Sequence, residues 1–260
     1  MADAGERDRP FSSAAATDIG RVRSENEDSL IERPDLGLWA VADGMGGHLA
    51  GAYASTCVTS TLAKIGPERD VEALARSCRA RLIEANAAIY EFSRTKAGGI
   101  VGTTVAALLA IDRRFACVWC GDSRVYRVRG DGIEQLTRDH TEVQEFVDSG
   151  ALTREEAAVW PSRNALTKAI GVAQMPQPES LFGDLLPDDA FVICSDGLPL
   201  HVSEGEILSA VRKRTPRAGC EHLLELALSR GGKDNVTAIV VQFRPDATRR
   251  MRETPPAEAG

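Results

Sequence analysis

Apolar runs alternate along this chain with polar turns and with stretches of helical periodicity. Runs rich in valine and isoleucine that are bounded by glycine, aspartate or proline are typical of strands. They predict one or two strands within 17–33 and further strands at 36–42, 100–111, 114–121, 124–129, 133–136, 190–195 and 236–243. Apolar residues spaced three and four apart predict helices at 47–65, 71–96, 204–213 and 218–230.

The order of these elements indicates the fold class. Consecutive strands are joined by short turns, such as Asp112-Arg113-Arg114 and Gly130-Asp131-Gly132, while the helices come in separate blocks. Short turns join antiparallel strands, whereas parallel strands need long crossover connections. The pattern therefore predicts an α+β protein built on antiparallel sheets. No G-x-G-x-x-G motif opens a helix after a strand, which argues against a dinucleotide-binding fold.

The two ends and one internal segment depart from this regular pattern. Residues 1–12 and 244–260 are rich in charge and proline and are predicted to be flexible tails around a domain at 13–243. Residues 140–175 contain helical fragments broken by glycine and proline without a strong core pattern. Irregular insertions of this length in a compact domain are often functional.

Composition excludes several classes of partner. The chain has 260 residues, with 38 acidic and 31 basic ones, and its net charge of −7 argues against nucleic-acid binding. Since no apolar run approaches the length of a membrane span and residues 1–10 lack a signal-peptide core, we expect no membrane contact and a cytoplasmic location. Most of the six cysteines lie in apolar patterns, which suits reduced thiols. Cys117 and Cys120, three apart in a strand, face opposite sides and cannot share a zinc ion.

Candidate chemistry lies where apolar runs meet aspartates. Three runs end at Asp43-Gly44, Gly121-Asp122 and Asp196-Gly197, and Asp234 stands just before the last run. Any one Asp–Gly pair alone is more often a turn. However, a carboxylate at the end of a buried strand is costly without a partner, and four brought together would repel one another. Carboxylate and carbonyl oxygens suit hard divalent cations, so the joint pattern predicts a Mg²⁺ or Mn²⁺ site.

Six ordered motifs resemble those of the bacterial, free-standing form of the metal-dependent type 2C (PPM) protein Ser/Thr phosphatases. They are TDIGRVRSENEDS at 17–29, DGMGGH at 43–48, GTT at 102–104, GDSR at 121–124, SDGL at 195–198 and KDNVT at 233–237. The resemblance covers roughly residues 14–243. It implies two packed antiparallel β-sheets flanked by helices, an α-β-β-α sandwich, with a two-metal centre at one end.

The resemblance also implies a set of metal ligands for Mn²⁺ or Mg²⁺. Asp43 is expected to bridge two ions, one of which also binds the Gly44 carbonyl. Asp196 and Asp234 are expected to hold the first ion. Glu27 is expected to serve the second, directly or through water.

Three more residues have implied roles around this centre. Asp122 matches a position that binds a weaker third metal, Asp28 is expected to give hydrogen-bonded support, and Arg23 is expected to bind the substrate phosphate. The planar guanidinium suits bidentate phosphate binding. The implied reaction is hydrolysis of phosphoserine and phosphothreonine in proteins by a hydroxide that bridges the two ions, because bound metals lower the pKa of water towards neutrality.

One position departs from the animal members of the family. They carry a histidine, proposed as the general acid, two residues after the bridging aspartate, where this chain has Met45. His48 does not align with that histidine and is interpreted as a capping or packing residue, so metal-bound water is an alternative proton donor. His140, at the start of the irregular insertion, is interpreted as structural.

The insertion and the partners complete the prediction. Residues 141–173 correspond in position to the flap of bacterial members and are expected to border the substrate groove, with Arg163 and Asn164 as polar candidates. The resemblance implies a monomer that reverses the phosphorylation carried out by a bacterial Ser/Thr kinase. More loosely, the chain also resembles members associated with type VI secretion. The alternative is a pseudophosphatase that only binds phosphoproteins; such proteins usually lose a metal aspartate, and none is missing here.

Overall fold

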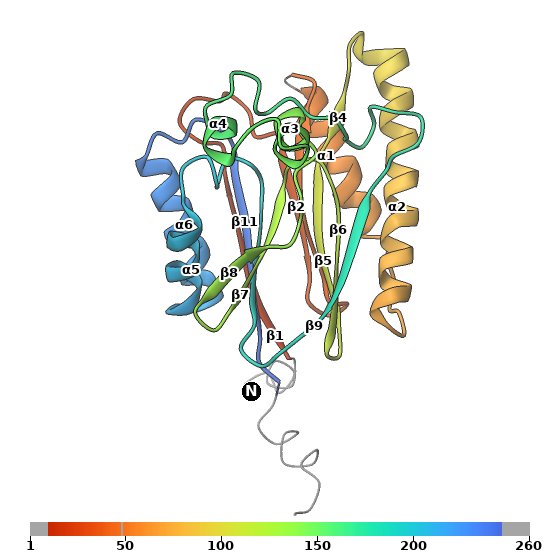
Figure 1. Ribbon diagram of the computed structural model, residues 1–260. Coiled ribbons are helices and arrows are strands. Elements are labelled where there is room, and N and C mark those ends of the chain that lie inside the picture. The colour runs from red at the N-terminus through yellow and green to blue at the C-terminus, as the bar shows by residue number, and fades with distance from the viewer. Residues whose placement is uncertain (1–9, 48, 246–260) are drawn as a thin grey trace, which may run out of the picture.

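The computed structural model describes residues 10–47 and 49–245 as a four-layer sandwich. Two antiparallel sheets pack face to face, and a pair of helices covers the outer face of each (Figure 1). The predicted α+β class and the α-β-β-α arrangement are thereby confirmed. Among the described residues, no helix is both long and apolar enough to span a bilayer.

The first sheet carries the last strand of the chain at its interior. Its strands, in spatial order, are β1 (Phe11–Asp18), β11 (Val236–Phe243), β10 (Ala190–Cys194), β7 (Arg124–Arg129) and β8 (Gly132–Gln135). Two helices cover its outer face, α5 (Glu204–Arg212) and α6 (Pro216–Ser229). Thr215 caps the start of α6 by accepting a hydrogen bond from the Ala218 N–H, and proline follows the cap, which explains the sharp beginning of this helix.

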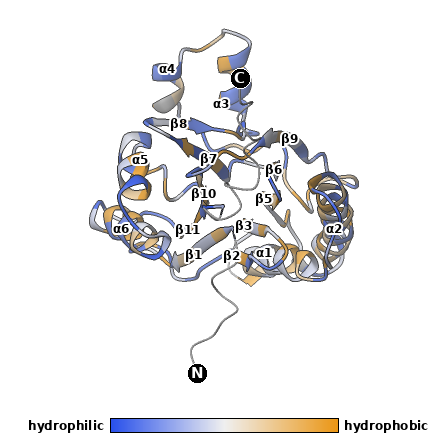
Figure 2. Cartoon of the chain, turned by 90° about the horizontal axis from the view of Figure 1, so that it is seen from below, coloured by the Kyte–Doolittle hydropathy of each residue, from blue (hydrophilic) through white to orange (hydrophobic). Residues whose placement is uncertain are grey.

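The second sheet carries the other two long helices. Its strands are β2 (Asp28–Arg33), β3 (Leu38–Met45), β5 (Val105–Ile111), β6 (Arg114–Cys120) and β9 (Glu179–Asp184), and the short β4 (Gly102–Thr103) pairs with β3. The covering helices are α1 (Leu49–Leu62) and α2 (Val71–Phe92), the latter running into a π-helical turn at Ser93–Ala97. Two short helices, α3 (Glu142–Asp148) and α4 (Arg154–Ala158), lie between β8 and β9 in sequence. They project from the sandwich beyond β7 and β8 (Figure 2).

Apolar side chains fill three separate layers of the sandwich. The central layer lies between the sheets and includes Trp39, Phe115, Phe191 and Ile239, while two further layers lie under the helices. Strand β11 is buried along its whole length because a sheet covers one face and α6 the other. Burial of each large side chain stabilises the fold by about 1.5–3 kcal/mol.

The two cysteines of the C-x-x-C motif lie in different layers. Cys117 belongs to the layer between the sheets, whereas Cys120 belongs to the layer under α1 and α2. All six cysteines are free thiols. The predicted placement of the two side chains on opposite faces of the strand is confirmed.

Several features differ from the sequence prediction, and the predicted strand at 100–111 is split into β4 and β5. Strand β9 was not predicted, and β1 begins at Phe11, inside the segment predicted to be a tail. The Phe11 ring packs against Trp39 and Phe243, at centroid distances of 5.4 and 5.2 Å, so burial of this ring extends the strand. The rest of the predicted tails, residues 1–9 and 246–260, lies outside the described residues.

Candidate metal centre

Five aspartates meet at one end of the sandwich, because strands of both sheets end or turn there. Asp43, in β3, is paired in register with Asp28, the first residue of β2. Asp196 follows β10 by two residues, and Asp234 precedes the neighbouring antiparallel β11 by two residues. Asp122 lies in the turn from β6 to β7, where the chain passes from one sheet to the other.

Burial and mutual proximity raise the pKa values of Asp28, Asp43, Asp122 and Asp196. Burial raises the pKa of Asp43 well above its usual range, and repulsion from the four other aspartates raises it further. Burial, with repulsion from neighbouring aspartates, also raises the pKa of Asp28 to about 7 and that of Asp122 to about 8. The pKa of Asp196 is raised by burial and by the Asp234 charge. A concentration of negative charge of this kind is stabilised by a bound cation.

The donor set fits hard divalent cations. All five side chains offer carboxylate oxygens, the ligands preferred by Mg²⁺ and Mn²⁺. The Oδ1 atom of Asp28 is buried and accepts no hydrogen bond from the described residues, which leaves it available as an oxygen donor. The coordination shell is not preformed, however: among the described residues, no three Asp, Glu, His or Cys side chains already stand in ligand geometry around one point.

Arg23 lies at the mouth of the acidic cluster. Its Nη2 donates to the Asp234 Oδ2 at 2.7 Å, and its side chain is 52% exposed. The hydrogen bond and charge of Asp234 raise the pKa of Arg23. The residue predicted to bind phosphate is therefore paired with a residue predicted to bind metal.

Two glycines let Glu27 approach the cluster. A Cβ atom on Gly44 would stand 2.1 Å from the Gly51 carbonyl oxygen, and one on Gly51 would stand 2.5 Å from Glu27 Oε1. The Gly44 N–H donates to the Glu27 carbonyl at 3.1 Å. Only glycine at both positions allows β3, α1 and the Glu27 carboxylate to pack this closely.

Sequence reasoning missed two residues that hold the site together. The Asn235 side chain accepts from the Glu27 N–H at 2.9 Å and donates to the carbonyls of Ile19 and Glu25, which fixes the loop before β2. Ser195 Oγ donates to Asp28 Oδ2 at 2.7 Å. The signal was present, since each residue is adjacent to a predicted metal aspartate within a motif.

A groove runs from the acidic cluster under the flap. Its volume is about 950 Å³, and Asp122 and Asp196 line it together with the flap residues Arg163 and Asn164. The two polar candidates of the flap are thus brought to the same groove as the metal-site aspartates. Met45, in contrast, pairs with Gly102 at the end of β3, and His48 lies outside the described residues.

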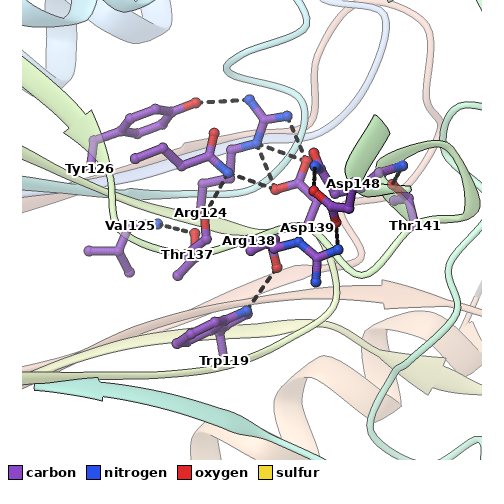
Figure 3. A network of polar contacts seen from close by, with 11 residues as sticks. Trp119, Arg124, Val125, Tyr126, Thr137, Arg138, Asp139, Thr141 and Asp148 are labelled. Atoms are coloured by element: carbon purple, nitrogen blue, oxygen red, sulfur yellow. Dashed lines mark hydrogen bonds and ion pairs between the residues drawn. The ribbon is translucent and has the colours of Figure 1, made fainter. Parts of the chain in front are cut away.

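A partly exposed network of ion pairs and hydrogen bonds lines this groove (Figure 3). Arg124 donates to Asp139 at 2.7 Å and to the Tyr126 hydroxyl at 2.9 Å. Arg138 forms an ion pair with Asp148 at the end of α3, which ties the flap to the segment before it. Residues outside the flap therefore line the groove together with residues of the flap.

Comparison with known proteins identifies the family. Residues 13–145, just over half of the chain, match the family model described as protein phosphatase 2C. The serine/threonine protein phosphatase PstP of Mycobacterium tuberculosis is 37% identical over 230 residues, covering 87% of this chain and 44% of PstP. The protein phosphatase PhpP of Streptococcus pneumoniae is 33% identical, covering 88% of this chain and 96% of PhpP. This chain thus spans less than half the length of PstP.

Solved structures agree with the sequence matches. The structure titled PppA, a key regulatory component of T6SS in Pseudomonas aeruginosa, has a TM-score of 0.84 at 36% identity over 90% of this chain and 98% of that one. The catalytic domain of PstP in complex with two manganese ions has a TM-score of 0.81 at 35% identity, again over 90% and 98%. The fold is that of the solved catalytic domain of PstP. This chain belongs to the protein phosphatase 2C family, whose manganese-bound member supports dependence on a divalent metal.

Proposed function

We propose that this protein hydrolyses phosphoserine and phosphothreonine in proteins with the help of two Mn²⁺ or Mg²⁺ ions and a weaker third. The observation that carries the proposal is the gathering of five aspartates from both sheets, among which burial and mutual repulsion raise the pKa values of Asp28, Asp43 and Asp122. The family and the completeness of the acidic set favour an active enzyme over a pseudophosphatase.

Each acidic residue has a proposed place in this centre. Asp43 would be shared by both ions, Asp196 and Asp234 would hold the first, Glu27 would serve the second, and the Gly44 carbonyl would bind one of the two. Asp122, with Asp196, would hold the third ion, and Asp28 would support the cluster through its bond to Ser195. Bound divalent ions supply an activated water and neutralise charge on the phosphoryl group.

Arg23 is proposed to orient the substrate. Its guanidinium sits at the solvent side of the cluster, where a phosphate can exchange for the Asp234 carboxylate as its partner. A charge-assisted bidentate contact would fix the phosphoryl group and stabilise negative charge that develops during hydrolysis. The groove under the flap would take the peptide on either side of the phosphorylated residue.

The biological setting is proposed from the relatives. We infer that the protein acts on phosphoproteins produced by a Ser/Thr kinase, as a monomer in the cytoplasm, where six free cysteines remain reduced. Likeness to PppA suggests a role connected with type VI secretion.

The test is metal-dependent hydrolysis of an aryl phosphate and of phosphoserine and phosphothreonine peptides. Activity is expected with Mn²⁺ or Mg²⁺ and is expected to disappear with a chelator. Turnover that persists after complete chelation would contradict the metal requirement. Binding of the phosphopeptides without turnover in any divalent metal would favour the pseudophosphatase.

A further inference from the structure

A histidine outside the predicted catalytic set joins the flap to the turn that carries Asp122. His140 is only 3% exposed and lies just before α3, in the segment that leads into the flap. Its backbone N–H donates to the Gly121 carbonyl at 3.0 Å, and the Gly121 N–H donates back to the His140 Nδ1 at 3.0 Å. Both polar backbone groups of Gly121, the residue before Asp122, are thus hydrogen-bonded to His140.

The hydrogen bonds of the imidazole specify its protonation. Because Nδ1 accepts from Gly121, the proton of the neutral ring belongs on Nε2. That nitrogen lies 3.0 Å from Glu179 Oε1, and the same oxygen receives the Lys168 ammonium at 2.8 Å. The chain Lys168–Glu179–His140–Gly121 therefore keeps one tautomer and one ring orientation, as outer partners of metal ligands commonly do.

The Gly121–Asp122 turn, which His140 contacts, packs closely against other residues of the acidic centre. Gly121 has φ +110°, and a Cβ there would stand 2.6 Å from Thr104 Cβ, so the turn rests directly on Thr104. The Thr104 hydroxyl lies 2.6 Å from Ser123 Oγ and accepts from the Asp43 N–H at 3.1 Å. A shift of this turn would move Asp122 and disturb the contact to the backbone of Asp43.

We propose that His140 is a positioning residue that sets the Gly121–Asp122 turn and thereby the affinity of the metal site containing Asp122. The inference rests on the proposed function for the identity of that site. The competing explanation is simple packing, since the His140 ring is stacked on Trp119 at 6.2 Å. Trp119 in turn donates to the Arg138 carbonyl at 2.9 Å, which holds the same segment without any help from the imidazole (Figure 3).

Two substitutions separate positioning from packing. His140→Asn keeps an acceptor near the place of Nδ1 but loses most of the ring, whereas His140→Phe keeps the stacked ring but has no acceptor for Gly121. Mn²⁺ titration of the full chain by calorimetry is expected to show the weakest site weakened about tenfold or more in His140→Phe. His140→Asn is expected to stay close to the unsubstituted protein. His222→Asn, on α6 and away from the centre, serves as the control.

The tautomer can be measured without any substitution. Nitrogen NMR of the metal-free protein is expected to show His140 protonated on Nε2, with Nδ1 accepting from the Gly121 amide. This measurement can overturn the proposal even if His140→Phe does not fold. A proton on Nδ1, or equal Mn²⁺ affinity in the two substituted proteins, would overturn the proposal.

Failure of this inference is distinguishable from failure of the proposed function. If the unsubstituted protein hydrolyses phosphopeptides while His140→Phe binds Mn²⁺ normally, the function stands and the positioning role is wrong. If the unsubstituted protein lacks turnover, the tautomer and the Mn²⁺ titration still test His140.

Discussion

At the scale of single residues, Asp43 and Arg23 differ in the groups that each contacts. Asp43 is surrounded by other carboxylates, whereas Arg23 is half exposed and contacts the cluster through one ion pair. We therefore expect Asp43→Asn to abolish turnover and Arg23→Ala mainly to raise KM for a phosphopeptide. Steady-state kinetics in saturating Mn²⁺ provide the measurement. Arg23→Lys is the variant that keeps the positive charge but lacks the planar guanidinium. Equal and small effects of both changes would contradict the proposed roles.

The raised carboxyl pKa values predict an unusual pH dependence of stability. With pKa values of about 7 for Asp28 and about 8 for Asp122, against an ordinary 3.8, the folded protein retains protons that the unfolded chain releases. Without metal, stability is therefore full below about pH 4 for these groups and falls as pH rises towards 8. Urea midpoints in chelator are expected to be lower at pH 8 than at pH 5. Since ions compete with these protons, Mn²⁺ should stabilise the protein more at pH 8.

Asp122→Asn is the matched control for this prediction. The amide keeps the shape of the side chain but has no carboxyl proton to lose, so the fall in stability between pH 5 and pH 8 should become shallower. A metal-free protein whose urea midpoint rises over this range would contradict the assignment of the buried carboxyl groups.

At the scale of elements, the flap is attached at both ends, and Ile170 near its end belongs to the core layer under α1 and α2. Thr141 and Leu166 form an isolated bridge at its base, and the Phe146 and Trp160 rings contact each other within it, at 6.0 Å. Replacing residues 142–165 with the flap of a relative should therefore alter the preference among phosphopeptides. Hydrolysis of a small aryl phosphate, which does not fill the groove, should remain largely unchanged. Loss of both activities would argue against a role in selectivity.

The elements show where sequence patterns are sufficient. Strands buried on both faces, such as β10 and β11, have continuous apolar runs and were predicted to within one residue. Strand β9 was missed because it is a half-exposed edge strand that contains Gly183, where a Cβ would stand 2.5 Å from the Phe115 ring. That glycine is explained only by a residue on a neighbouring strand, which periodicity does not reveal.

The site shows a similar limit. Every predicted metal aspartate lies at the same end of the sandwich, because each stands at a recognisable strand end or turn. The hydrogen bond from Asn235 to Ile19 joins segments more than 200 residues apart in sequence. The hydrogen bond between Gly121 and His140 joins residues that are 19 apart. The pairing of Arg23 with Asp234 also follows from tertiary structure alone.

At the scale of the whole molecule, stability depends on the layer between the sheets. Phe191 is 1% exposed and contacts Phe115 at a centroid distance of 5.1 Å. Phe191→Ala should lower the free energy of unfolding by about 3–5 kcal/mol, because the cavity lies where neither sheet can easily collapse. Phe182→Ala, on the edge strand and 43% exposed, should cost far less. Urea denaturation of both in chelator measures the difference, and equal losses would contradict this account of the core.

The ion pair between Arg23 and Asp234 has a thermodynamic consequence for the two ligands. In the metal-free molecule each side chain satisfies the other, so a cation arriving at Asp234 liberates the guanidinium, and an anion captured by Arg23 liberates the carboxylate. Cation and anion should thus bind cooperatively, and by reciprocity each should improve the affinity of the other by the same factor. Calorimetric titration of Mg²⁺ with and without inorganic phosphate measures this factor, which should shrink towards one in Arg23→Ala. The protein would then bind its metal ions most tightly when a phosphate ester is also bound.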